Sequence, residues 1–464
     1  MKKAVLVFVI AVAAVCTVLA QGARQVSLVI TNGIVVTVDG ANRIITPGAV
    51  AIDDTNIVAV DTVDAIRQRF RGTDTIDAAG TVVMPGLVNT HSHAPMVLFR
   101  GLADDLALSD WLTKYIFPAE AKLVSPEFVR AGTRLAALEM IESGTTTYAD
   151  MYYFEEEIAK ATKAAGLRGV LGETIIDFPV ADAKTPAAGL ARAETYIKAF
   201  QNDPLITPAV APHAPYTVGM ANLKAARALS VKYKVPTLIH VSETQQEEAD
   251  SKKAHGARSV VAYLDSFGFL GPGVVAAHGV WVDAADITIL KARGVGIAHN
   301  PESNMKLASG IAPVEAYLAA NVAIGLGTDG AASNNDLDMF EAMRTASFLQ
   351  KVATKDPTAL SARTVVRMAT IGGARVLGLD KLIGSLEPGK RADIIVVGMT
   401  SPRQTPMYDP ISHLVYVTRG DDVQTTIVNG KVLMRNRKVL TLDPQVVLQE
   451  AYGWAPKVRA AVAH

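Results

Sequence analysis

Cysteine is almost missing from this sequence. Among 464 residues there is one, Cys16, and it lies in an apolar stretch at the start of the chain. Without that stretch the chain holds no thiol, so disulfides, thiolate nucleophiles and cysteine-ligated zinc are excluded. Zinc sites of the cytidine deaminase type, which use His and Cys ligands, are excluded with them.

The chain also carries no net charge. The chain carries 45 basic and 45 acidic residues, and its first twenty residues include two lysines and no acid. Partners such as nucleic acid or anionic membranes attract proteins with a basic excess, so neither is expected here. The sequence contains no GxSxG elbow and no P-loop, which argues against those two catalytic classes.

The first twenty residues, MKKAVLVFVIAVAAVCTVLA, combine two lysines, an apolar run and Val18-Leu19-Ala20 before Gln21. This order is typical of a signal peptide. The apolar run of roughly sixteen residues is shorter than the about 20 that a spanning helix needs. We therefore expect cleavage after residues 1–20 and a periplasmic or secreted protein without stable membrane insertion. A retained anchor and a lipid anchor on Cys16 are the alternatives.

Both ends of the remaining chain have a β-rich texture. Residues 21–85 contain short alternating runs such as SLVITNGIVVTVDG and GAVAIDDTNIVAV, and residues 383–443 contain RADIIVVG, HLVYVTRG and VQTTIVNGKVLMRN. Alternation broken by Gly and Asn turns predicts half-buried antiparallel strands. We expect one small β-sandwich built from both segments, followed by residues 444–464 as a packed helix or a loose tail.

The middle of the chain, residues 86–382, alternates short apolar runs with helical stretches. Eight strand candidates occur in order: GLVNTHSH, TTTYADMY, RGVLGETI, ITPAVAPH, PTLIHVSE, VVAAHG, GVGIAHN and VAIGLGTD. Parallel strands need helical crossovers, so the pattern predicts an α/β fold with a (β/α)₈ TIM barrel. A doubly wound open sheet is the alternative, since strand count does not prove closure.

Histidine and aspartate gather at the ends of six of these strand candidates, where barrel enzymes build their sites. The residues are His91, His93, His213, His240, His278, His299 and Asp329. His91 and His93 are two apart, so on a strand their side chains leave the same face and can meet one cation. A pair of ordinary polar histidines is the alternative reading of this short motif.

A closed barrel would bring His91, His93, His240 and Asp329 to one mouth. Three imidazoles and a carboxylate suit one divalent ion, with Zn²⁺ expected and Fe²⁺, Ni²⁺ or Mn²⁺ as alternatives. Such an ion makes water a nucleophile near neutral pH. For Asp329 the competing interpretation is a helix N-cap before Ala331. The fourth strand candidate, ITPAVAPH, offers no lysine to bridge a second metal, so a binuclear site is not expected.

Glu243 follows His240 by three residues and can reach over the metal to move protons, provided burial raises its pKa. A surface position in SETQQEEADS is the alternative. His278 can orient the attacking water or stabilise charge, unless it is a buried core histidine. His213 and His299 either contact substrate or cap neighbouring loops.

These residues resemble the amidohydrolase superfamily, in particular its 5′-methylthioadenosine/S-adenosylhomocysteine deaminases and the related triazine hydrolases. The matching phrases include PGLVNTHSHAPMVLFRGLADDLALSDWL, FPAE, HAPYTVG, HVSETQQEEADS, AAHGVW, HNPESNMKLASGIAPV and GTDGAASNNDLDMFEAMR. Together they cover the predicted barrel from end to end.

The resemblance implies a metal-dependent deaminase of an adenine nucleoside. His91, His93, His240 and Asp329 would be its metal ligands, Glu243 the proton shuttle and His278 its partner, with Asp329 also handling a proton of the water. Glu120 in FPAE would hold ribose hydroxyls and His213 would contact the nucleoside. A homo-oligomer is compatible with this expectation. The alternatives are an amidohydrolase acting on a triazine, pterin, guanine or cytosine type of ring, and a binding protein that kept the barrel.

One position departs from the family. Related deaminases place an arginine near the end of the third strand, suited to the carboxylate of S-adenosylhomocysteine, whereas VLGETIID places Glu173 there. We therefore expect 5′-methylthioadenosine, 5′-deoxyadenosine or adenosine to be preferred over S-adenosylhomocysteine.

Overall fold

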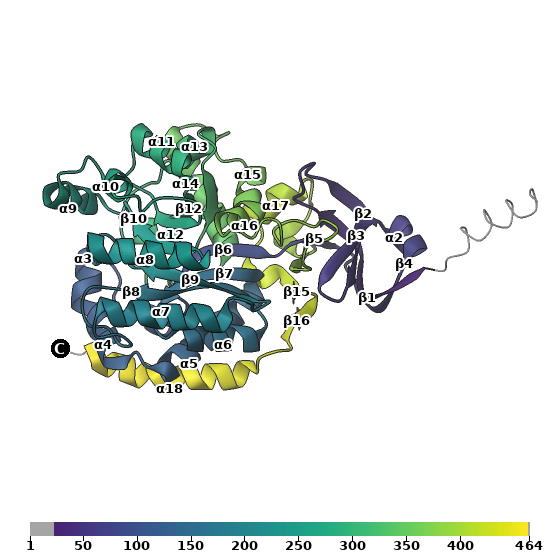
Figure 1. The fold of residues 1–464 in the computed structure, drawn as a ribbon. Helices are drawn as coiled ribbons and strands as arrows, with labels where there is room; N and C mark the ends of the chain where they lie inside the picture. Colours follow the sequence, from purple (N-terminus) through teal and green to yellow (C-terminus); the bar gives the residue numbers. More distant parts are fainter. Residues whose placement is uncertain (1–22, 463–464) are drawn as a thin grey trace, which may run out of the picture.

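The computed structural model describes residues 23–462. The predicted signal peptide, residues 1–20, lies outside the described residues. Two β-sheets organise the described part: an eight-stranded sheet surrounded by helices, and a nine-stranded sheet beside it (Figure 1). Within residues 23–462, every helix is too short or too polar to cross a bilayer.

The eight-stranded sheet is the predicted barrel. Its strands lie side by side in sequence order and neighbouring strands run parallel, which confirms the fold class. The eight are β6 (Leu87–Ser92), β7 (Thr145–Tyr152), β8 (Arg168–Ile175), β9 (Ile206–Pro212), β10 (Thr237–Val241), β11 (Val274–His278), β12 (Gly296–His299) and β13 (Ala323–Leu326).

The first and last strands meet, so the sheet is closed and the open alternative is wrong. The Thr90 hydroxyl on β6 donates to the carbonyl oxygen of Leu326 on β13 at 2.8 Å. Just beyond the strands, the backbone N–H of Asp329 donates to the carbonyl oxygen of His91 at 3.0 Å. This second bond ties two predicted metal ligands together through their main chain.

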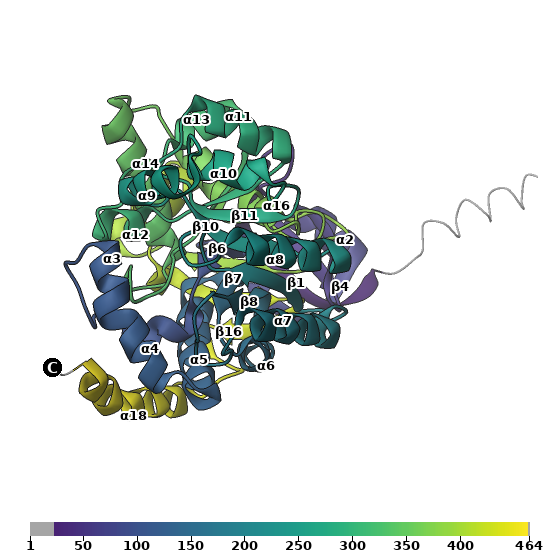
Figure 2. The same ribbon diagram turned by 60° about the vertical axis from the view of Figure 1, so that its left-hand side comes forward.

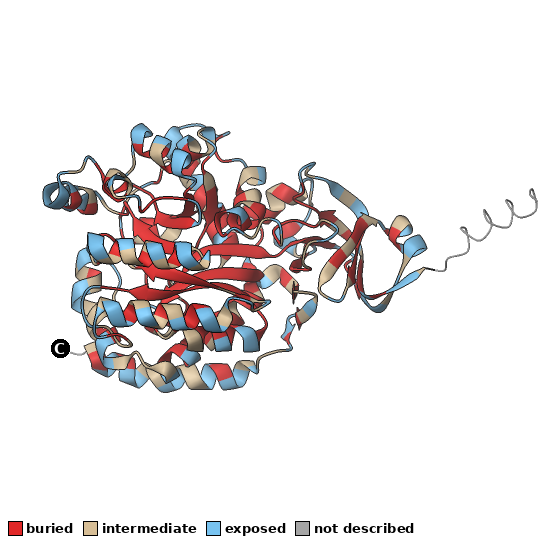
Figure 3. Cartoon of the chain, viewed as in Figure 1, coloured by how far each residue is buried: buried red, intermediate tan, exposed pale blue. Residues whose placement is uncertain are grey.

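Burial explains the continuous apolar runs of these strands. Six of them, β6, β7, β8, β10, β11 and β12, are buried along their whole length (Figure 3). Helices cover the outside of such a barrel and side chains fill its interior. The longer covering helices are α5 (Pro126–Ser143), α6 (Glu155–Ala165), α7 (Pro186–Phe200), α8 (Met220–Tyr233), α9 (Gln245–His255), α11 (Ala284–Arg293) and α14 (Met339–Thr354).

Polar residues set where these helices begin. The side chains of Ser125, Thr185, Thr244, Asp283 and Asp338 each accept a backbone N–H from the first turn of the helix that follows. Shorter helices complete the barrel: α10 (Val260–Ser266), α12 (Pro301–Lys306), α13 (Val314–Ala319), α15 (Ala362–Arg367) and α16 (Gly373–Val376). A π-helical turn, η3 (Met368–Gly372), joins the last two.

The second sheet draws its strands from both ends of the described chain, as predicted. The N-terminal segment supplies β1 (Arg24–Val36), β2 (Ile44–Asp53), β3 (Asn56–Thr62), β4 (Phe70–Asp77) and β5 (Thr81–Pro85). The C-terminal segment supplies β14 (Ile394–Gly398), β15 (Val423–Val428), β16 (Lys431–Arg435) and β17 (Lys438–Val439). β5 and β14 join the two halves as an antiparallel pair.

Two details of this module differ from the prediction. β1 pairs in parallel with β4 and β5, because the short helix α2 (Val63–Arg69) crosses over between β3 and β4. The segment HLVYVTRG, predicted as a strand, instead ends helix α17 (Pro410–Tyr416). Asp409 caps that helix and Pro410 occupies its first turn, whereas a short apolar run alone does not distinguish a strand from a buried helix.

Residues 444–462 form helix α18 (Pro444–Val462), which packs against the barrel. It lies beside α5 and against α4 (Phe117–Leu123), the short helix that follows the π-helical turn η2 (Trp111–Ile116) (Figure 2). The Lys122 ammonium donates to the carbonyl oxygen of Ala461 at 2.6 Å, and Arg134 contacts Glu450 at 2.6 Å. α18 therefore supports the segment that carries Glu120.

Candidate metal centre and active site

The two histidines of the HxH motif converge on one carboxylate. The Nε2 atoms of His91 and His93 lie 3.4 Å and 3.3 Å from Oδ1 of Asp329. Their rings meet edge to face, with centroids 4.9 Å apart. Since β6 and β13 are the strands that close the barrel, closure itself brings these three side chains together.

His240, at the end of β10, completes the predicted set. Its Nε2 atom lies 3.3 Å from Nε2 of His93. Tetrahedral zinc with nitrogen ligands at about 2.0–2.1 Å separates two such nitrogens by about 3.3 Å. The buried Nε2 atom of His91 has no hydrogen-bond partner. The spacing and this unpartnered nitrogen fit a divalent ion held by His91, His93, His240 and Asp329.

Backbone carbonyls orient two of these rings. Nδ1 of His93 lies 2.7 Å from the carbonyl oxygen of Met151, and Nδ1 of His240 lies 2.7 Å from that of His213. A carbonyl oxygen only accepts, so each Nδ1 carries the proton. The Nε2 lone pairs of the neutral rings are then left for an ion at the centre.

The protonation states favour ligand formation, with one exception. Burial lowers the pKa of His91 to about 4 and holds that of His240 well below its usual value. Burial acts on His93 in the same direction, but the Asp329 carboxylate outweighs it and raises the pKa of His93 to about 9. Without an ion, His93 and Asp329 therefore hold a proton between them at neutral pH.

Asp329 is placed by its surroundings, and it does not cap a helix. Its backbone is left-handed, with φ of 65°, a strained conformation that concentrates at functional sites. The Ser303 hydroxyl donates to its Oδ2 at 2.7 Å. A turn follows Asp329, and α14 begins only at Met339 with Asp338 as its cap. The interpretation of Asp329 as a helix N-cap is therefore wrong.

Glu243 lies inside the cavity, so the alternative of a surface glutamate is wrong. Its side chain is buried, and burial raises its pKa. The Ser309 hydroxyl donates to Oε1 at 3.3 Å, while Oε2 lies 3.6 Å from Nε2 of His278. A carboxyl whose pKa is raised beside the metal position can both release and accept a proton.

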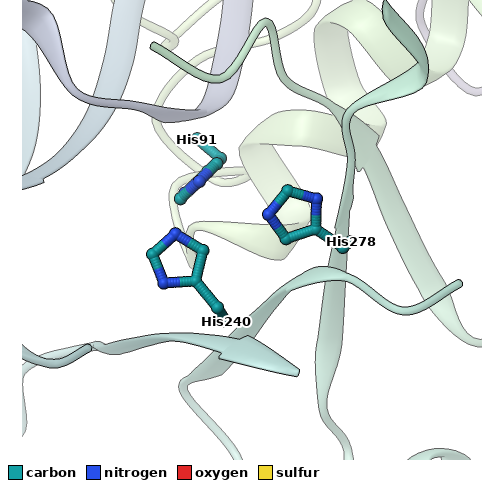
Figure 4. Close-up of side chains that lie close together, drawn as sticks. All are labelled: His91, His240 and His278. Carbon is teal, nitrogen blue, oxygen red and sulfur yellow. The ribbon is translucent and has the colours of Figure 1, made fainter. Parts of the chain in front are cut away.

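His278 lies closer to the predicted metal position than its expected role of orienting the attacking water requires. Its Nε2 atom is 3.9 Å from Oδ2 of Asp329, and its ring converges with those of His91 and His240 (Figure 4). Its Nδ1 atom is 2.9 Å from the Asn304 side-chain oxygen, which fixes the orientation of the ring. His278 thus faces both acidic groups, where it can orient a water molecule.

Glu120 and His213 line the same cavity. Glu120 on α4 is buried, which raises its pKa to about 7, and the Tyr152 hydroxyl donates to its Oε1 at 2.7 Å. Nδ1 of His213 lies 2.9 Å from the Thr217 hydroxyl, and burial lowers the pKa of this ring to about 3. His299 is different: it is buried in the barrel, outside the cavity lining, and both its ring nitrogens lack partners.

The rest of the lining contains residues that the sequence analysis missed. Tyr152 and Thr174 lie at the ends of β7 and β8, so the strand-end rule that identified the histidines also pointed to them. Leu108, Trp111, Leu112 and Ile116 come from the segment before α4. The first three lie in a phrase that matches the family, but nothing in that phrase placed them at the cavity. The free volume inside this lining is about 50 Å³, so a substrate larger than a few waters must displace part of this apolar wall.

Glu173 does not act as the sequence analysis assumed. Its side chain is fully buried outside the cavity lining, where its Oε1 pairs with Arg192 at 2.8 Å and its Oε2 accepts the backbone N–H of Glu155 at 3.0 Å. The next residue, Thr174, faces the cavity instead. Repulsion by Glu173 is therefore no argument about the substrate.

The closed barrel, the cluster of histidine rings and the buried Glu243 together define a metal-site hydrolase of the (β/α)₈ class. The model of the Amidohydrolase family matches residues 82–433, and the chain belongs to this family. A 5-methylthioadenosine/S-adenosylhomocysteine deaminase of Syntrophobacter fumaroxidans is 48% identical over 92% of this chain and 98% of its own length. A 5′-deoxyadenosine deaminase of Methanosarcina acetivorans is 47% identical over 91% of this chain and 96% of its own.

Solved structures agree with the fold. An adenosine deaminase of Xanthomonas campestris with bound zinc is 40% identical, has a TM-score of 0.93 and is matched over 94% of this chain and 100% of its own. A triazine hydrolase of Arthrobacter aurescens is similar in fold alone, with 23% identity, a TM-score of 0.84 and coverage of 94% and 99%.

Proposed function

We propose that this protein deaminates an adenine nucleoside such as 5′-methylthioadenosine, 5′-deoxyadenosine or adenosine, by replacing the C6 amino group with oxygen and releasing ammonia. The observation that carries the proposal is the meeting of His91, His93, His240 and Asp329 within ligand spacing beneath the buried Glu243. Support for the substrate class comes from relatives named as deaminases of such nucleosides.

The four converging residues would hold one divalent ion, which we expect to be Zn²⁺. When bound, the ion supplies a nucleophile by lowering the pKa of water towards 7. We propose a single ion, because the fourth strand offers no lysine to bridge a second one. The zinc-containing neighbour of known structure agrees with this choice.

Three residues move or hold protons in the proposed reaction. Asp329 accepts a proton from the attacking water, and Glu243 delivers a proton to N1 of the ring as C6 becomes tetrahedral. His278, held by Asn304, orients the water and stabilises the charge that develops. Asp329 then passes its proton to the amino group so that ammonia leaves, and the remaining hydroxyl proton returns to Glu243 as the C6 carbonyl forms.

Glu120 and His213 would bind the sugar side of the substrate. Glu120 faces the cavity with a carboxyl that can accept hydrogen bonds from two ribose hydroxyls. His213 lies against His240, with ring centroids 4.8 Å apart, so it can contact a nucleoside whose base reaches the centre.

Ammonia release from a panel of adenine nucleosides tests this function. We expect the zinc-loaded protein to release ammonia from at least one of 5′-methylthioadenosine, 5′-deoxyadenosine and adenosine, with loss of the adenine absorbance band. A protein that binds zinc and leaves all three intact would overturn the proposal. Turnover of triazines, pterins, guanine or cytosine in their place would point to another ring.

We further propose that residues 1–20 direct the protein to the periplasm or the exterior. This proposal rests on the order of lysines, apolar run and Val18-Leu19-Ala20 in the sequence. N-terminal sequencing of protein recovered from the periplasm should begin near Gln21, and a full-length chain confined to the cytosol would overturn it.

A further inference from the structure

A second hollow adjoins the active-site cavity and is separate from the metal position. It has a volume of about 590 Å³ and is open to solvent. We call it the outer groove; its walls are the loops that follow β8 and β9 and one side of α9. Tyr216 lines both the cavity and the outer groove, so its ring lies between the two spaces.

Aromatic side chains pack against one another between the two spaces. The ring of Phe117 on α4 packs against Phe178 with centroids 5.5 Å apart and against His213 at 6.3 Å. His213 in turn contacts Tyr216 at 5.9 Å. Phe117 is one helical turn before Glu120, the residue proposed to hold the ribose. A ribose at Glu120 would thus place its 5′ side beside these rings.

Carboxyl groups line the far part of the outer groove. Asp177 and Asp250 face it from opposite walls, and no lysine or arginine is among the described residues that line it; His255 is the one basic side chain there. Asp177 accepts hydrogen bonds from Gly219 and Asn222, each at 2.8 Å, while Asp250 accepts one from Gln246 at 2.9 Å. Asp250 is exposed and keeps accepting capacity for a ligand.

A third carboxyl gives independent evidence that the outer groove is a binding site. Glu247 is 92% buried, and its Oε2 accepts the backbone N–H of Glu243 at 2.7 Å. Its other oxygen, Oε1, is buried without a hydrogen-bond partner although the residue lines the outer groove. Buried polar atoms rarely stay unpaired, so this oxygen leaves hydrogen-bonding capacity free at the wall of the outer groove.

We propose that the outer groove receives the 5′ substituent of the nucleoside and selects apolar or amine-bearing substituents over those that end in a carboxylate. The inference rests on the proposed function and names the substrate class more closely. Phe178 and Tyr216 provide the apolar wall for the part nearest C5′. Asp250 provides an acceptor for an ammonium group and repels an anion. Burial raises the pKa of Glu247 to about 8, so at pH 7 its Oε1 contributes a hydrogen-bonding group and little charge.

A matched pair of substrates tests the proposal on the full-length, zinc-loaded enzyme. One is 5′-deoxy-5′-(3-aminopropylthio)adenosine and the other 5′-deoxy-5′-(2-carboxyethylthio)adenosine, with 5′-deoxyadenosine as the reference without a substituent. We expect kcat/KM for the amine to exceed that for the carboxylate at least 10-fold. If the two kcat/KM values lie within 2-fold of each other, the proposed role of the outer groove is wrong, while the proposed deamination is unaffected. Failure to deaminate 5′-deoxyadenosine would overturn both proposals.

Variants then assign the selectivity to the outer groove. Asp250→Asn should lower the amine-to-carboxylate ratio at least 3-fold without changing kcat/KM for 5′-deoxyadenosine. Asp54→Asn, which makes the same charge change in an exposed turn of the other sheet, should leave the ratio unchanged. Equal ratios in the Asp250 variant and the wild type would show that long-range charge, and not this groove, discriminates.

Discussion

Oε2 of Glu243 lies 3.6 Å from Nε2 of His278, and both side chains are buried beside the predicted metal position. The two residues come from different strand ends, β10 and β11, which are neighbours in the barrel. The contact therefore follows from the strand order. It gives the site a carboxyl whose pKa is raised by burial, next to a ring that Asn304 holds in place.

Glu243→Gln should lower kcat at least about 10²-fold, because the amide cannot take and return the proton of a general acid–base group. Metal content and melting temperature should stay close to wild type, since Glu243 is outside the four predicted ligands. Glu248→Gln is the matched control, because Glu248 lies on α9 outside the cavity lining. A Glu243 variant with wild-type turnover would remove this residue from the mechanism.

Metal binding should release about one proton per ion at pH 7. The Asp329 carboxylate, acting against burial, raises the pKa of His93 to about 9, and an ion must displace that proton. Affinity for Zn²⁺ should therefore strengthen as the pH rises towards 9. The folding stability of the metal-free protein should change in the opposite direction. The contribution of the raised His93 pKa to that stability is present below about pH 6.5 and is lost as the pH rises through about 9.

Calorimetric titration of the metal-free protein with Zn²⁺ in two buffers of different ionisation enthalpy measures the proton count. Thermal unfolding of the metal-free protein between pH 6 and 10 checks the second half of the prediction. Zinc binding without proton release at pH 7 would show that His93 and Asp329 hold no proton between them.

The sequence predicted most of this site because strand ends in a closed barrel converge whatever the details of packing. His91, His93, His240 and Asp329 needed only their strand assignments. The roles of Glu173 and Thr174 could not be predicted, since adjacent residues at a strand end face opposite sides and a one-residue difference decides which lines the cavity. Trp111 and the other apolar residues before α4 belong to no strand end, so only the tertiary structure shows that they cover the centre.

Glu120→Gln should weaken recognition of the ribose. Hydrogen bonds to a charged group contribute about 1.5–3 kcal/mol, so kcat/KM for adenosine should fall about 10- to 100-fold. The value for 2′,3′-dideoxyadenosine should change little, because that nucleoside lacks the hydroxyls. Wild-type preference for adenosine over the dideoxy compound should also grow as the pH rises through about 7, where burial places the pKa of Glu120. In the Glu120→Gln variant this preference should not rise with pH. If the variant and the wild type prefer adenosine to the same extent, the ribose binds elsewhere.

A buried ion pair joins the barrel to the second sheet. Nε of Arg168 on β8 lies 2.9 Å from Oδ2 of Asp393, just before β14, and each side chain is 2% exposed. Asp393 also accepts the backbone N–H of Asn429 at 2.7 Å, and Arg168 donates to the carbonyl oxygen of Pro204 at 2.9 Å. These bonds link four separate segments of the chain.

Arg168→Met should lower the free energy of unfolding by about 3–5 kcal/mol, because it leaves the Asp393 carboxylate buried without its counter-charge. Adding Asp393→Asn should recover part of that loss, since the second change removes the unpaired charge. Arg24→Met is the control: Arg24 pairs with Asp53 on the surface, where 59% and 37% of the two side chains are exposed, so its loss should change stability little. Chemical unfolding of the three variants would contradict the argument if Arg168→Met and Arg24→Met proved equally stable.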